Sequence, residues 1–95
     1  MPNSEKILTL HPAGKKGVNI SLEKYEQVRK VLLDIVSNKP KITFSDMADL
    51  AEQKLTVQQF DGKPLWYITT IKLDLEARGI IGRVPKTSPH QLIVK

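Results

Sequence analysis

The chain has 95 residues, of which 40% are hydrophobic and 26% are charged, and this length accommodates one domain with a single core. The absence of cysteine excludes a disulfide scaffold, thiolate metal sites and a thiol nucleophile. No apolar run approaches the ~18 residues of a membrane span and no secretory-type leader opens the chain, so we expect a soluble cytoplasmic protein.

The net charge of +5 comes mostly from the two ends of the chain. Residues 1–20 hold three lysines against one glutamate, and residues 79–95 hold three cationic side chains and no acidic one. A basic domain with a nearly neutral middle suits a polyanion that is contacted at the edges of the domain. An ordinary solvated surface explains the same charge equally well.

The first part of the chain is expected to form a short arm and a long helix. Residues 5–10 are expected to form a short strand or tethered arm, a turn-rich loop covers 12–17, and residues 18–20 are expected to be extended. Ser21 offers a helix N-cap, and the helix continues to about Ser37. Its apolar side chains recur at three-and-four spacing: Leu22, Tyr25, Val28, Leu32, Ile35 and Val36.

Two shorter helices are predicted next. Residues 41–44 are a short β-prone step, and Ser45 is the expected cap of the second helix. The inward face of that helix is formed by Met47, Leu50, Ala51 and Leu55. The third helix is predicted from about Pro64 to Arg78, with Gly79 at the left-handed position that follows the last turn.

The chain is expected to end in a β-hairpin. Residues 80–84 and 91–94 are strand-like, and the segment between them has the composition of a hairpin tip. We therefore expect an arm and basic loop over residues 1–20, followed by one globular unit over residues 21–95. The fold class is mainly α with a small β-hairpin.

This order of elements resembles a winged helix–turn–helix domain. Residues 75–83 look like the end of the recognition helix and the first wing strand of many bacterial winged-helix regulators. The chain over about residues 5–94 also resembles a small group of stand-alone bacterial winged-helix proteins, through the elements His11-Pro12…Gly14-Lys15…Gly17-Val18-Asn19, Phe60-Asp61-Gly62 and Trp66-Tyr67…Lys72 to Gly79. The resemblance implies that residues 64–78 enter the major groove of DNA and that the wing, residues 83–93, lies on the backbone.

The third helix has two apolar sides. Ile68, Ile71 and Leu75 share the face that would pack on the other helices. The opposite face carries Trp66, Thr70, Leu73 and Ala77. A helix that reads bases normally presents Arg, Asn, Gln or Ser, because these side chains match the hydrogen-bonding pattern of the major groove. This helix departs from that pattern.

The first hypothesis is therefore binding to double-stranded DNA, as a possible transcriptional regulator. The expected contacts are cations and hydrogen-bonding side chains of the third helix, the wing and the first loop: Lys63, Tyr67, Thr69, Thr70, Lys72, Arg83, Lys86, Thr87, Ser88, His90, Lys15 and Lys16. The alternative is a protein-interaction module or homodimer that docks through Trp66, Leu73 and Ala77. The arm around residues 7–10 can also cover that face within the same chain.

Other chemistries are not expected. No nucleophile–base pair or convergent carboxylates can be assembled, so the protein is predicted not to be an enzyme. His11 and His90 lack partners at metal-ligand spacing, which predicts no metal site. The lysines between Gly14 and Gly17 lack the spacing of a phosphate-binding loop. No cofactor, small-molecule ligand or membrane partner is evident.

Overall fold

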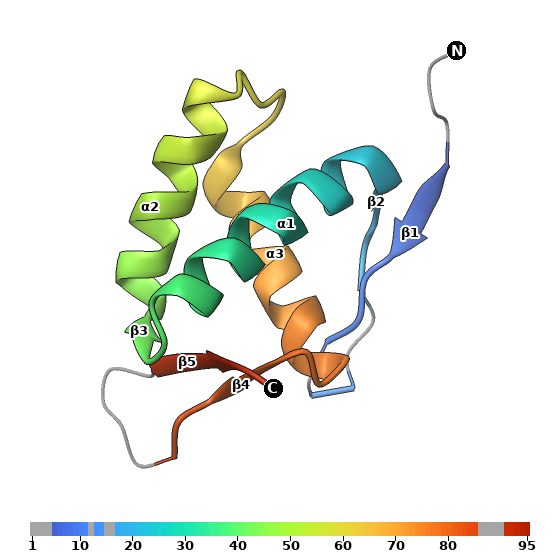
Figure 1. Ribbon diagram of the computed structural model, residues 1–95. Coiled ribbons are helices and arrows are strands. Elements are labelled where there is room, and N and C mark those ends of the chain that lie inside the picture. Colours follow the sequence, from blue (N-terminus) through green and yellow to red (C-terminus); the bar gives the residue numbers. More distant parts are fainter. Residues whose placement is uncertain (1–4, 12, 15–16, 86–90) are drawn as a thin grey trace.

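Three helices and two small antiparallel sheets make up the fold (Figure 1). The computed structural model describes residues 5–11, 13–14, 17–85 and 91–95. In chain order the elements are β1 (Lys6–Leu8), β2 (Asn19–Ser21), α1 (Leu22–Asn38), β3 (Ile42–Thr43), α2 (Phe44–Val57), α3 (Pro64–Ala77), β4 (Ile81–Arg83) and β5 (Gln91–Val94). Within those ranges, none of the helices has the length and apolarity needed to cross a bilayer.

The core lies where the apolar faces of the three helices meet. The predicted inner face of α3 is confirmed, since Ile68, Ile71 and Leu75 are fully buried. The predicted stripe of α1 is also largely confirmed, because all its members except the half-buried Leu22 are buried. Burial of these side chains is the main stabilising contribution to the fold.

The helix starts follow local capping. Ser21 caps α1 as predicted, its hydroxyl accepting a hydrogen bond from the Lys24 amide. The expected cap of α2 at Ser45 is wrong. Thr43 caps α2 instead, accepting from the Asp46 amide at 3.2 Å, and Ser45 lies inside the helix. The backbone of Thr43 is extended because it ends β3, which is the conformation that an N-cap requires.

The end of α3 is confirmed to within one residue. Gly79 adopts the left-handed conformation with φ of 75°. Its amide donates to the Glu76 carbonyl at 3.1 Å, and the next amide, of Ile80, donates to the Leu75 carbonyl at 3.0 Å. This pair of bonds satisfies carbonyls of the last turn and directs the chain straight into β4.

The C-terminal strands form a three-stranded sheet with β3, in the order β3-β5-β4. The central strand β5 pairs on both sides, with Leu92 opposite Ile42 in one neighbour and opposite Arg83 in the other. The predicted pairing of the last two strands is therefore confirmed, while the hairpin tip, residues 86–90, lies outside the described residues. The sheet connects the hairpin to the step between α1 and α2.

The N-terminal segment forms a second, two-stranded sheet, which confirms the strand expected within residues 5–10. We call β1, β2 and the described residues between them the arm. Its strands are continued by a bond from the Thr9 amide to the Val18 carbonyl at 2.9 Å. Gly17 permits this approach, because a Cβ there would lie 1.8 Å from the Thr9 carbonyl oxygen.

Candidate functional site

Helix α3 carries most of those predicted site residues that the structure describes, and it is held from two sides. The arm is attached through its residue Leu10, and β4 is attached through its residue Arg83. Both attachments end on carboxylates of α3, Asp74 and Glu76. Because these carboxylates are two positions apart, they point about 200° apart around the helix axis.

Asp74 joins the arm, α1 and α3. Its carboxylate is fully buried and accepts from the Leu10 amide at 2.8 Å, from the Tyr25 hydroxyl, and from Arg78 Nε at 2.9 and 3.0 Å. Burial, together with the hydrogen bond to Asp74, raises the pKa of Tyr25 to about 12. The hydrogen bond to Asp74 also raises the pKa of Arg78. The buried charge is therefore paired and its oxygens are satisfied.

Glu76 joins α3 to the base of the hairpin. Its Oε2 accepts from Arg83 Nε at 2.8 Å, and its Oε1 forms an ion pair with Lys72 Nζ. Lys72 was expected to face DNA, but its side chain is only 10% exposed and its ammonium lies over the Phe44 ring, 5.2 Å from the centroid. Two of the predicted DNA-contacting cations thus share one carboxylate.

The other predicted DNA contacts are spread around α3. Lys63 and Thr69 are exposed. Tyr67 is half-buried and packs edge-to-face on Phe60, with ring centroids 5.0 Å apart. Thr70 faces the arm. Half of the predicted set lies outside the described residues: Lys15, Lys16, Lys86, Thr87, Ser88 and His90.

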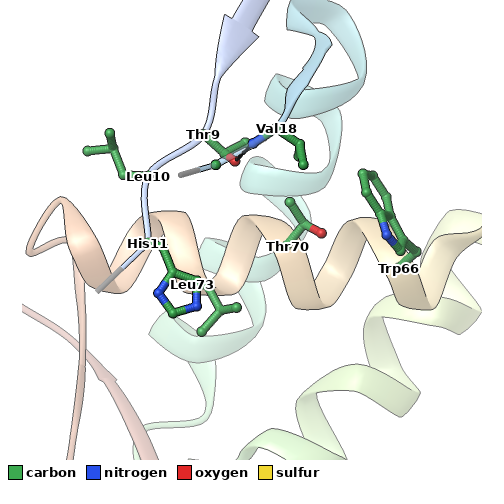
Figure 2. Close-up of a pocket in the computed structure, with 8 residues that line it drawn as sticks. Thr9, Leu10, His11, Val18, Trp66, Thr70 and Leu73 are labelled. Carbon is green, nitrogen blue, oxygen red and sulfur yellow. Dashed lines mark hydrogen bonds between the residues drawn. The ribbon is translucent and has the colours of Figure 1, made fainter. Parts of the chain in front are cut away.

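The arm covers part of the second apolar face of α3, which answers the question that the sequence left open. A pocket of about 170 Å³ remains between them (Figure 2), lined by Thr9, Leu10, His11, Gly17, Val18, Trp66, Thr70 and Leu73. Of the predicted docking residues, Leu73 and Ala77 are half-buried, whereas Trp66 stays 46% exposed.

The sequence analysis did not identify Asp74 and Glu76 as the residues that attach the arm and the hairpin to α3. The available signal was their spacing: Asp74 precedes Arg78 by four positions, and Lys72 precedes Glu76 by four. In the ranges that the structure describes, no group of three or more metal-ligating side chains gathers.

The geometry defines a small domain whose third helix is held between an N-terminal arm and a C-terminal hairpin. Residues 6–92 match the family described as a family of unknown function (DUF6958), and the chain belongs to this family. The matched region includes all three helices, β1, β2 and both strands of the hairpin up to Leu92. The comparisons with curated proteins and with solved structures gave no match.

Proposed function

We propose that this protein is a winged helix–turn–helix protein that binds double-stranded DNA and acts in transcription as a regulator or accessory factor. The observation that carries the proposal is the sheet order β3-β5-β4 at one end of the three packed helices, with β4 next to α3. It brings the base of the hairpin to α3, where Arg83 bonds Glu76 at 2.8 Å. A recognition helix flanked by a hairpin is the arrangement with which such domains approach a groove and the adjacent backbone.

The open flank of α3 supports contact with the DNA backbone more than reading of bases. Leu65 and Thr69 are exposed and lie one turn apart, with Lys63 just before the helix. A lysine and a hydroxyl suit phosphate oxygens, and of these side chains only Lys63 has the donors for a two-point contact with a base. Binding is therefore expected to depend weakly on sequence and strongly on charge.

The Glu76 cluster adds a surplus of positive charge at the junction of α3 and the hairpin. Lys72, Glu76 and Arg83 together carry a net charge of +1, and the Arg83 side chain is 42% exposed. A phosphate group near Arg83 would meet a cation whose present partner is a single carboxylate. This supports placing the DNA backbone on the hairpin side of α3 rather than on the arm side.

The test is a titration of random duplex and single-stranded DNA over a series of salt concentrations. We expect duplex binding at low salt, with log K falling by ~0.9 for each phosphate neutralised as log salt rises. Lys86→Ala should flatten that slope by ~1, whereas Lys30→Ala, on the exposed side of α1, should leave it unchanged. Absence of duplex binding at low salt would reject the proposal.

A second candidate is self-association through the Trp66 face of α3. It is favoured by Trp66, a large apolar side chain that stays 46% exposed beside the arm. Light scattering of the parent chain and of Trp66→Glu tests this directly. A dimer that the substitution dissociates supports the candidate, and a monomeric parent rules it out.

A further inference from the structure

The pocket between the arm and α3 has the size of a site for a small molecule. Its volume is about 170 Å³, and a cavity of roughly 150 Å³ admits a single benzene ring. Trp66 contributes an aromatic wall, and Val18 and Leu73 contribute aliphatic ones. Figure 2 shows Thr70 on α3 between Trp66 and Leu73, with Thr9 and Val18 of the arm across from the helix.

Two polar groups of the pocket have hydrogen-bonding capacity to spare. In the part of the chain that the structure describes, no hydrogen bond is made by the Thr70 hydroxyl or by His11 Nε2. His11 Nδ1 accepts from the Ala13 amide at 3.1 Å, so a neutral His11 carries its proton on Nε2. The pocket therefore offers an O–H and an N–H donor within an otherwise apolar lining.

The remaining polar side chain of the lining has a structural role. The Thr9 hydroxyl accepts from the Val18 amide at 3.0 Å and is 2% exposed as a residue. This bond, with the bond from the Leu10 amide to Asp74, fixes the arm wall against α3. Because both walls are anchored, a ligand would enter a preformed site and would not bear the entropic cost of ordering it.

From these features we propose that the pocket binds a small one-ring aromatic compound that carries a hydrogen-bond acceptor oxygen. The ring takes the apolar volume beside Trp66, and the oxygen accepts from Thr70 and from His11. The site lies on the arm side of α3, so this inference is independent of the proposed binding of DNA on the hairpin side. It adds a ligand that the sequence did not suggest.

The experiment uses benzoate as the probe and benzene as the matched probe without an acceptor, each added to the full chain. Backbone amide shifts in nuclear magnetic resonance locate binding, and Trp66, the only tryptophan, reports it by fluorescence. We expect benzoate to shift amides of Thr9–His11 and Thr70–Leu73, and to bind at least about threefold more tightly than benzene because of the hydrogen bonds.

The variant Thr70→Val keeps the side-chain shape and removes the hydroxyl, so benzoate binding should weaken about three- to tenfold. Thr69→Val is the control, because Thr69 is exposed and does not line the pocket. Benzoate that produces no shifts at its highest soluble concentration, or shifts only elsewhere, overturns the proposal. Equal binding of benzoate and benzene, or equal effects of the two variants, overturns the role of the acceptor.

Discussion

On each side of α3 a carboxylate of the helix binds a neighbouring segment, but the two carboxylates differ in burial and in the charge of their partners. On the arm side, Asp74 is fully buried and accepts bonds from Leu10, Tyr25 and Arg78. On the hairpin side, Glu76 binds two cations, one of which, Arg83, is 42% exposed. The first carboxylate is fully buried, whereas the second is 9% exposed and only one of its two partners, Arg83, lies at the surface, where another anion can compete for it.

The difference in charge follows from the number of cations at each carboxylate. Asp74 is matched by one guanidinium and two neutral donors, so its junction carries no net charge. Glu76 is matched by an ammonium and a guanidinium, so its junction is positive. The arm side therefore has a structural role, whereas the positive charge on the hairpin side is the basis for the proposed binding of DNA there. Substitutions can test this distinction.

The largest expected effect is on stability, from truncation of the buried carboxylate. Asp74→Ala leaves the Arg78 charge without its partner and the Tyr25 and Leu10 donors unsatisfied, which should lower the free energy of unfolding by about 3–5 kcal/mol. Glu76→Ala should cost less, about 2 kcal/mol, since Arg83 can reach water and only the largely buried Lys72 loses its partner. Urea denaturation measures both, and equal losses would contradict the comparison.

Tyr25, on the arm side, should make stability depend on pH. The pKa of Tyr25 is about 12 in the folded protein against 10.0 for an ordinary tyrosine. The unfolded chain therefore loses this proton first, and stability should fall by about 2–3 kcal/mol as the pH rises from 10 to 12. Below pH 10 this group should have no effect. Urea denaturation of Tyr25→Phe should no longer show the loss of stability that Tyr25 causes between pH 10 and 12. The same loss in the variant as in the parent would show that Tyr25 is not its cause.

The close approach within the arm predicts a smaller loss. Gly17→Ala places a Cβ 1.8 Å from the Thr9 carbonyl oxygen, so the backbone must shift, at a cost of about 2 kcal/mol. Gly14→Ala meets no atom within 4 Å and should cost only the ~1 kcal/mol of a left-handed alanine. Thermal unfolding of both variants ranks them, and the reverse order would show that the arm is not held as described.

The smallest expected effect concerns binding and has the opposite sign. Glu76→Gln removes the carboxylate that pairs with the exposed Arg83, so duplex affinity at low salt should rise about threefold and the salt slope should steepen by ~1. Glu26→Gln makes the same change of charge on the exposed side of α1 and should have a smaller effect. Fluorescence anisotropy of labelled duplex gives both values. A loss of affinity in Glu76→Gln would mean that Glu76 positions the hairpin for binding.

The elements of this fold were predictable because their signals are local. The cap at Ser21, the proline at the start of α3 and the glycine after it each depend on a few neighbouring residues. The one misplaced cap illustrates the limit: Thr43 and Ser45 both carry a capping hydroxyl, and only the pairing of β3 with β5 selects Thr43. The local sequence permits either residue to cap α2, and the tertiary structure determines which one does.

The candidate site was less predictable because its contacts are distant in sequence. The hydrogen bond from the Leu10 amide to Asp74 joins residues 64 positions apart, and no sequence pattern in either segment predicts it. The burial of Lys72 likewise depends on Phe44 of another helix. The helical spacing did indicate the second apolar face around Trp66, but only the folded chain reveals that the arm lies over part of it and leaves a pocket.

The most direct test of the proposed function is to map a short DNA duplex on the isotope-labelled protein by its amide shifts. Our account predicts that the shifts concentrate around Lys63 and Thr69 and at Arg83 beside Glu76, while Thr9–His11 stay unchanged. Shifts confined to the arm, or none at low salt, would contradict it.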